Sequence, residues 1–307
     1  MVEQRTLKRP DRPAYSARRR REAFSALLML SPALLVFLGL VVYPLLSTLW
    51  LSFFDYGLTN PVRRFVGLGN YFELTRDPVF WRALENNVII LIGSVIVQVG
   101  LGLVLAAILD RGIRRGATLF RTIIFAPMVM SVIAVGLLWQ LIYNPSIGIL
   151  SKALQLVNIP VPTQGWLGDP DIVIYSILAV ACWQYTGFMM VLLLAGMQAV
   201  PAELYDAAKM DGASEAQSFL YITVPGIRNV LIVAVLITMI GAFKVFDVVY
   251  ILTLGGPADS SQVLGLYLFQ SAFTLNRAGY ANAIAAVLLV FTLVLGLLQL
   301  RFSRGTG

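Results

Sequence analysis

The chain has 307 residues, of which 58% are hydrophobic and 13% are charged, and its formal net charge is +7. Soluble domains carry roughly 25% charged residues, so a water-soluble globule of this size would lack the polar surface needed to cover its core. The composition therefore predicts a single membrane domain and excludes an ordinary soluble protein.

Residues 1–25 form a basic segment that contains four consecutive arginines, Arg18 to Arg21. The apolar run behind them extends for about 25 residues, whereas the apolar core of a cleavable signal peptide has about 7–15. We therefore expect a retained membrane anchor at 26–50.

Six apolar runs are long enough to cross about 30 Å of hydrocarbon at about 1.5 Å per residue. Prolines such as Pro44 and Pro127 lie near the ends of these runs, where neighbouring groups can satisfy the backbone, so we expect them not to change the count. The sequence predicts an all-α polytopic membrane protein with one transmembrane domain over 26–307. Its six helices are expected, within about 2–4 residues, at 26–50, 87–109, 122–143, 172–197, 229–250 and 281–300.

The distribution of lysine and arginine predicts the orientation. If both termini are cytoplasmic, the cytoplasmic segments hold 16 of these residues and the outer segments hold six. The positive-inside rule then favours cytoplasmic termini, and the connection between spans four and five lies in the cytoplasm. This topology accounts for the net charge, and no basic face interleaved with aromatic residues indicates a nucleic-acid partner.

The connection over 201–225 is a polar, helix-patterned segment between two long apolar runs. Pro201 fits the first turn of a helix, and Gly212 can adopt the left-handed conformation that closes one. Ser214 and Gln217 match a capping box, which begins a second helix. We predict a helix–turn–helix pair that docks on a partner; the alternative is an ordinary amphipathic connector. Side chains expected to take part in docking are Glu203, Asp206, Ala207, Ala208, Asp211, Ala213, Phe219 and Pro225.

The sequence does not contain the residues that several kinds of functional site require. The chain has no histidine, and its one cysteine is Cys182, so disulfides, zinc sites and imidazole base catalysis are unsupported. It also has no G-x-x-x-x-G-K-[ST] phosphate loop. We expect a chain that is not an enzyme and holds no cofactor, so any energy must come from a partner.

The order of residues in the connection carries a resemblance. Asp206, Ala207 and Ala208 are followed by Gly212, and nine residues then lead to Ile222-Thr223-Val224-Pro225. This arrangement resembles the EAA loop of ATP-binding-cassette importer permeases, whose pattern is E-A-A-x-x-x-G followed after nine residues by I-x-L-P. Asp206 stands where the family usually has Glu and Val224 where it has Leu, and both keep the charge or the apolar character.

Other segments are similar to permeases of the carbohydrate-uptake, maltose-type branch, and to the first of its two permease types. The chain has a short tail after span six, and only about 35 residues separate spans one and two, so it lacks the large outer insertion of the enteric maltose permease. The similar segments are 65–71, 77–81, Asn86, 246–257 and 279–281.

The resemblance implies a four-part importer in a prokaryotic plasma membrane. Two non-identical permeases would form the path, and two nucleotide-binding subunits would bind ATP and Mg²⁺ and hydrolyse the ATP. An extracytoplasmic solute-binding protein would deliver a sugar. The 201–225 pair would sit in a cleft of the ATPase and move as a rigid lever when the ATPase dimer closes.

The residues that line the route of the sugar across the membrane are harder to predict. Lys244 is the one basic residue well inside a predicted span, where a charge costs roughly 2.5–3.5 kcal/mol. Asp247 follows three residues later, on the same face of the expected helix. The two form a structural salt bridge, or Lys244 extends outward, or the pair lines the sugar cavity. Other side chains suited to sugar hydroxyls and ring faces are Trp183, Gln184, Tyr185, Thr186, Asn276, Tyr280 and Asn282.

Three alternatives are less well supported. An ion-driven transporter would need an intramembrane carboxylate relay or matched helix breaks, and Asp247 is the one acidic residue inside a predicted span, with no matched breaks or inverted repeat. An intramembrane enzyme would need a nucleophile with a base. A phosphorylated cargo, such as glycerol phosphate, would depend on Lys244 alone.

Overall fold

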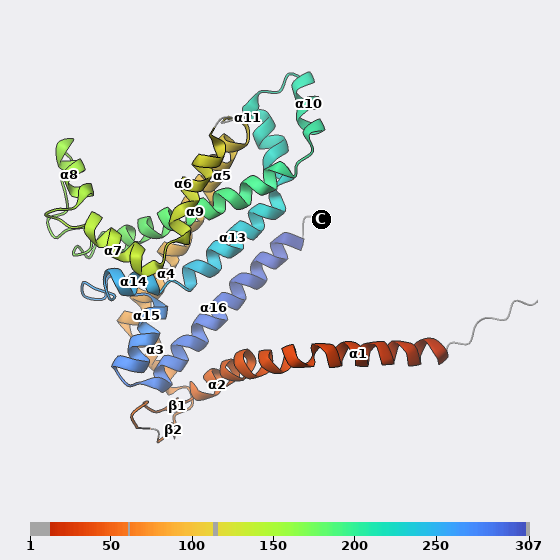
Figure 1. Cartoon of the computed structure of the whole chain (residues 1–307). Helices are drawn as coiled ribbons and strands as arrows, with labels where there is room; N and C mark the ends of the chain where they lie inside the picture. Colours follow the sequence, from red (N-terminus) through yellow and green to blue (C-terminus); the bar gives the residue numbers. More distant parts are fainter. Residues whose placement is uncertain (1–12, 61, 113–115, 305–307) are drawn as a thin grey trace, which may run out of the picture. The chain divides into compact units, whose positions relative to one another are not determined.

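The computed structural model describes residues 13–60, 62–112 and 116–304, and most of these are helical (Figure 1). They divide into two compact units, residues 1–51 and residues 52–307. The predicted basic segment 1–25 lies partly outside the described residues, so its separation from the transmembrane domain stays a prediction.

The described part of the first unit, residues 13–51, is one long helix. The part from Ser25 to Leu51 is long and apolar enough to cross a membrane, which confirms the expected first span. Pro44 has no N–H for the carbonyl four residues earlier, and the wider π turn just before it absorbs the mismatch, so the helix continues. Its consecutive parts are α1 (Pro13–Phe37), η1 (Leu38–Val42) and α2 (Tyr43–Leu51).

Span two begins at Pro78, earlier than the expected start at residue 87. The carboxylate of Asp77 accepts the Val79 N–H at 2.9 Å, and Pro78 occupies the first turn, so the helix is capped at this point. The consecutive parts of span two are α4 (Pro78–Ser94), η2 (Val95–Val99), α5 (Gly100–Ala107) and η3 (Ile108–Gly112).

Span three is not the single helix expected at 122–143. It consists of α6 (Ala117–Val129) and α7 (Val132–Ile142), which meet at an angle of 100°. Ser131 is extended, and its Oγ accepts the Ala134 N–H at 3.2 Å. A serine in this N-cap position begins a new helix, which explains the break. The short helix α8 (Ile149–Leu156) follows.

Span four, α9 (Val173–Gln198), lies at the centre of the second unit and agrees with the expected 172–197. It packs against α4, α5 and α6. At Gly187 the backbones of α9 and α6 approach so closely that a Cβ would lie 2.1 Å from the carbonyl oxygen of Ile124. Small residues permit such approaches between membrane helices.

Span five is also broken, so the prediction of a single helix at 229–250 is wrong as well. α13 (Arg228–Phe243) ends before Lys244, and α14 (Asp247–Leu252) begins after Phe246, whose φ of −140° and ψ of −56° are not helical. Two spans therefore carry breaks, although none was expected. Apolar runs lie on both sides of each break, and hydropathy does not register a change of backbone direction between them.

Span six agrees with the expected 281–300, because α16 extends over Ala278–Arg304. Before it lie α15 (Leu264–Phe269) and η5 (Gln270–Thr274). A short antiparallel pair precedes span two, β1 (Phe54–Asp55) with β2 (Arg64–Phe65), in which Phe54 faces Phe65. It is followed by α3 (Gly69–Arg76).

Between spans four and five lie α10 (Ala202–Met210), α11 (Glu215–Ser218), η4 (Phe219–Thr223) and α12 (Val224–Gly226). In the second unit, α10 and α11 lie at one end and α3 and α15 at the opposite end, with α13 and α16 running between them (Figure 1). We call these the α10 end and the α15 end.

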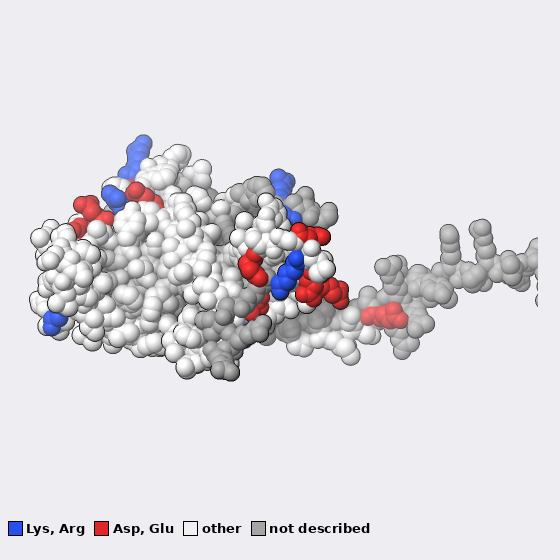
Figure 2. All heavy atoms as spheres, turned by 90° about the horizontal axis from the view of Figure 1, so that it is seen from above, with Lys and Arg blue, Asp and Glu red and all other residues white. Residues whose placement is uncertain are grey.

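The described residues contain four helices long and apolar enough to cross a membrane, or up to six spans when each of two bent helix pairs counts as one. These pairs are Ala117–Val129 with Val132–Ile142, and Glu215–Gly226 with Arg228–Phe243. This agrees with the expected all-α membrane fold, while the orientation of the termini stays a prediction. Viewed from the α10 end, most of the surface carries no charged residue (Figure 2). The spans also expose large apolar side chains, such as Ile96, Val104 and Leu137, and these suit contact with lipid tails.

Candidate functional site

The first helix of the connection, α10, begins and ends as its sequence predicts. It starts directly after Pro201, with Glu203 in its first turn and Lys209 in its last. These charges are complementary to the positive amino end and the negative carboxyl end of the helix dipole.

The turn after α10 depends on Gly212, whose φ is +78°. The Gly212 N–H donates to the carbonyl of Lys209 at 3.1 Å, and the Ala213 N–H donates to that of Ala208 at 2.9 Å. This pair of bonds is the Schellman arrangement, which requires a left-handed residue that glycine adopts at little cost. The turn sets the direction in which the second helix leaves.

The second helix begins with the predicted capping box. Gln217 N–H donates to Ser214 Oγ at 3.3 Å, and Ser214 N–H donates to Gln217 Oε1 at 2.8 Å. The helix then continues from Glu215 to Gly226 and meets α13 at 70°. The hydroxyls of Tyr205 and Thr223 lie 3.0 Å apart and join the two helices. We call α10, α11, η4 and α12 together the helix pair.

The helix pair presents both charged and apolar side chains to its surroundings. Met210 is 88% exposed and Tyr221 is 77% exposed. Glu203, Asp206, Ala207, Asp211 and Pro225 are also exposed, whereas Ala208 and Ala213 are half-buried. Phe219 points the other way and packs against the buried cluster that α5 and α9 form. It therefore anchors the helix pair to the spans rather than facing outward.

A cavity of about 410 Å³ lies where the two broken spans meet α4 and α9. Met128 and Val132 line it from the break in span three, and Lys244 to Asp247 line it from the break in span five. Its other polar side chains are Ser94, Gln98, Tyr185 and Thr238, and its aromatic ones include Phe188 and Phe246. The breaks therefore place polar groups and free backbone at the centre of an otherwise apolar unit.

Lys244 and Asp247 do not share a helical face, because α13 ends at Phe243 and Asp247 begins α14. This corrects the arrangement expected from their spacing. Both nevertheless line the cavity together with Tyr185. Among the described residues, no ion pair within 4.0 Å involves either side chain. The cavity therefore contains one cation and one carboxylate that are not paired with each other.

Gln184 and Trp183 do not line the cavity. Gln184 is 1% exposed, and its Oε1 has no hydrogen-bond partner. Trp183 packs edge-on against Trp139 at 5.6 Å. Thr186 donates to the carbonyl of Cys182 at 2.7 Å within the same helix. Of the four candidates in span four, only Tyr185 reaches the cavity.

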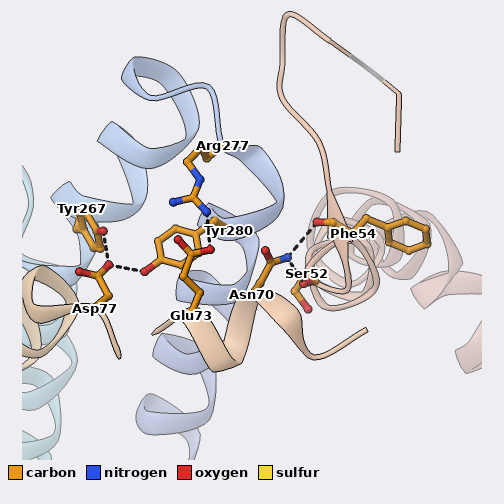
Figure 3. Close-up of polar contacts among 8 residues, drawn as sticks. All are labelled: Ser52, Phe54, Asn70, Glu73, Asp77, Tyr267, Arg277 and Tyr280. Carbon is orange, nitrogen blue, oxygen red and sulfur yellow. Dashed lines mark hydrogen bonds and ion pairs between the residues drawn. The ribbon is translucent and has the colours of Figure 1, made fainter. Parts of the chain in front are cut away.

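The candidates near span six lie at the α15 end. Asn276 bonds to Thr59, and Asn282 Nδ2 donates to Tyr56 Oη at 2.8 Å. The hydroxyls of Tyr280 and Tyr267 both donate to the carboxylate of Asp77 (Figure 3). None of these candidates lines the cavity.

An ion pair also joins two segments at the α15 end. Arg277 forms an ion pair with Glu73 at 2.6 Å (Figure 3), and this hydrogen bond raises the pKa of the guanidinium. Burial opposes ionisation of Asp77, but hydrogen bonds from the two tyrosines and from backbone N–H groups outweigh it and hold the pKa of this carboxyl below its ordinary value. The network joins α3, α15 and α16, so it stabilises the α15 end.

The sequence interpretation missed Ser94 and Gln98, which line the cavity from span two. A signal was present, since Asn87, Ser94 and Gln98 are spaced by seven and four residues in an otherwise apolar run. That spacing puts three polar side chains on one helical face. Among the described residues, no group of three or more His, Cys, Asp or Glu side chains could hold a metal ion.

Comparison with known proteins agrees with this architecture. A model of the family "binding-protein-dependent transport system inner membrane component" matches residues 98–307. A probable ABC transporter permease protein of Bacillus subtilis is 45% identical over 278 residues, which cover 90% of this chain and 95% of that protein. The trehalose/maltose transport system permease protein of Thermococcus litoralis is 35% identical, with 92% of this chain and 95% of that protein covered.

A solved structure supports the fold independently. One chain of a bacterial alginate ABC transporter, determined in complex with an alginate pentasaccharide-bound periplasmic protein, superposes with a TM-score of 0.81. It is 21% identical, and the match covers 96% of this chain and 98% of that chain. These matches confirm the resemblance that the 206–225 residues carry: the chain belongs to the family of binding-protein-dependent transport system inner membrane components.

Proposed function

We propose that this chain is one of two non-identical permease subunits of an ATP-driven importer for a sugar. Its relatives supply the cargo class, since the Thermococcus litoralis protein is a trehalose/maltose permease. The observation that carries the mechanism is the continuity of α13, which begins at the helix pair and ends at the cavity. Movement of the helix pair therefore has a direct structural route to the cavity.

The helix pair would dock in a cleft of a nucleotide-binding subunit. Its apolar side chains Met210 and Tyr221 are not covered by any part of the chain that the structure describes, and exposed apolar surface of this kind indicates a binding partner. ATP and Mg²⁺ would bind to two such partner subunits and not to this chain. Docking can drive transport only if the ATPase contacts the helix pair differently in its open and closed states.

The α10 end would face the cytoplasm and the α15 end would face outward, where an extracytoplasmic solute-binding protein docks. The excess of lysine and arginine in the segments assigned to the cytoplasm supports this orientation.

The cavity would form part of the sugar path. Its volume of about 410 Å³ falls within the roughly 300–1,000 Å³ of typical ligand sites. The rings of Tyr185 and Phe246 could stack on a sugar face, while Lys244 and Asp247 could exchange hydrogen bonds with its hydroxyls. Discontinuous helices that meet at a site are typical of membrane transporters.

Two experiments test the proposal. Purification through a tag on this chain should yield a second permease and an ATPase, and the complex in proteoliposomes should take up one member of a panel of labelled mono- and disaccharides. For orientation, Met210→Cys in a Cys182→Ala background should react with a membrane-impermeant maleimide in inside-out vesicles. Reaction of this cysteine in intact cells instead, or isolation of the chain without an ATPase, would refute the scheme.

A further inference from the structure

A side-chain amide of span two binds the end of α13, where span five breaks. Asn87 on α4 donates from Nδ2 to the carbonyl of Ala242 at 3.0 Å, and its Oδ1 accepts the N–H of Leu264 at 2.8 Å. Ala242 lies in the last turn of α13 and Leu264 in the first turn of α15. One side chain therefore joins three helices at the break.

The two backbone groups that Asn87 serves have no partner within their own helices. The last carbonyls and the first N–H groups of a helix lack intrahelical partners, and at membrane depth water does not replace them. A primary amide offers a donor and an acceptor on one short side chain, which matches this carbonyl and N–H pair. Asn87 is fully buried, at 0% exposure, so these bonds are shielded from solvent.

The adjacent residue provides an internal comparison. Asn86 is 2% exposed, and its Nδ2 donates to the carbonyls of Ser260 and Gln262, each at 2.8 Å. Both amides therefore lie on α4, are buried, and make two bonds to backbone. They differ in target, because Asn86 holds the loop before α15, whereas Asn87 holds the end of α13.

Asn87 contacts α13 at its last turn, and this position gives the contact a mechanical consequence. α13 has 16 residues, so it is about 24 Å long at about 1.5 Å per residue. Its first residue follows the helix pair, and its last turn contains Ala242, just before the cavity-lining stretch from Lys244 to Asp247. A rigid helix held at one point and displaced at its far end pivots about the point at which it is held.

We infer that Asn87 is a positioning residue, the pivot point on span two at which movement of the helix pair becomes a change in the cavity. This inference rests on the proposed function, because it requires an ATPase that moves the helix pair. Asn86, whose two hydrogen bonds go to the loop before α15 and not to α13, has no such role. Loss of Asn87 should leave ATP hydrolysis intact and disconnect it from the cavity.

The test measures the cavity with a chemical probe. Val245, which lines the cavity, is replaced by cysteine in a Cys182→Ala background, and the whole complex is purified through a tag on this chain. The rate of reaction with N-ethylmaleimide is then measured without nucleotide and after trapping with Mg²⁺, ATP and vanadate. With both asparagines present, the two rates should differ by about 5- to 150-fold, the usual range of coupling between sites.

Asn87→Ala should abolish this difference, while Asn86→Ala should preserve it. Each variant loses one buried amide and its two hydrogen bonds to backbone, so the two carry the same kind of cost, and both should assemble and hydrolyse ATP. If Asn87→Ala fails to assemble, Asn87→Ser replaces it, because a hydroxyl reaches one of the two backbone groups and not both; the same loss is expected.

The possible results separate the two proposals. If the reaction rate does not respond to nucleotide even with both asparagines present, the lever of the proposed function is refuted, and the pivot with it. If the rate responds but Asn87→Ala keeps the response, the pivot alone is refuted. An equal loss in the two alanine variants also overturns it, since that result indicates a general cost of removing a buried amide.

Discussion

Gly212 offers a direct test of how the turn of the helix pair contributes to transport. Its φ of +78° is in the left-handed region, and no atom lies within 4 Å of the position that a Cβ would occupy. This holds beyond Gly212 itself and its two chain neighbours, so a side chain there meets no more distant described residue, and the cost of substitution comes from the local backbone. For a residue other than glycine that cost is about 1–2 kcal/mol.

Valine and asparagine separate the backbone effect from any effect of side-chain size. Valine is β-branched and strongly disfavours a positive φ, whereas asparagine tolerates it. In Gly212→Val the cost of about 1–2 kcal/mol lowers the ratio of the native turn to other conformations about 5- to 30-fold. The bonds from Gly212 and Ala213 to α10 then break, and α11 leaves in another direction.

The assay is sugar uptake by the reconstituted complex, with the amounts of assembled chain and ATPase measured in parallel. Gly212→Val should lower uptake, by up to about 30-fold, while Gly212→Asn should remain near the wild-type rate and both variants insert normally. Wild-type uptake in the valine variant, or equal losses in both variants, would show that the left-handed turn is not what transmits movement.

Three further results are expected. Gly187→Ala should lower the thermal unfolding midpoint of the purified chain, because the added Cβ meets the backbone of α6, at an expected cost of about 1–3 kcal/mol. Gly100→Ala is the control: its Cβ would have no neighbour within 4 Å beyond the local helix backbone, so the midpoint should not fall. Lys244→Met should raise the KM for sugar uptake about tenfold or more through the loss of a charged hydrogen bond, whereas Lys152→Met on exposed α8 should leave it unchanged; equal KM values would remove Lys244 from the path. The hydrogen-bonded carboxylate of Asp77 has a pKa below its ordinary 3.8, so its stabilising contribution is complete above that pH and is lost as the pH falls through the lower folded value. The unfolding midpoint of the wild type should therefore fall more steeply below about pH 4 than that of Asp77→Asn, and parallel curves would contradict this reasoning.

The helix pair was predictable residue by residue because its signals are local. Gly212 closes α10 through bonds to residues no more than five positions earlier, and the capping box joins Ser214 to a residue three positions later. The existence of the spans was equally predictable, since each needs only an unbroken apolar run. The start of span two was placed too late because Arg82, Glu85, Asn86 and Asn87 interrupt the apolar pattern in the first turns of α4.

The site was predictable only in part. Tyr185, Lys244 and Asp247 do line one cavity, but the sequence placed the last two on a single helix that does not exist. Asn276, Tyr280 and Asn282 were grouped with them by chemistry alone, and the fold puts them in the network at the α15 end.

The sequence by itself therefore determined a six-span membrane chain with a capped helix pair, because hydropathy and capping act over a few neighbouring residues. The tertiary structure alone decided where spans three and five break, which side chains enclose the cavity, and which amide holds the end of α13. Asn87 and Ala242 are 155 positions apart along the chain, and a pattern that compares near neighbours carries no information about such a contact.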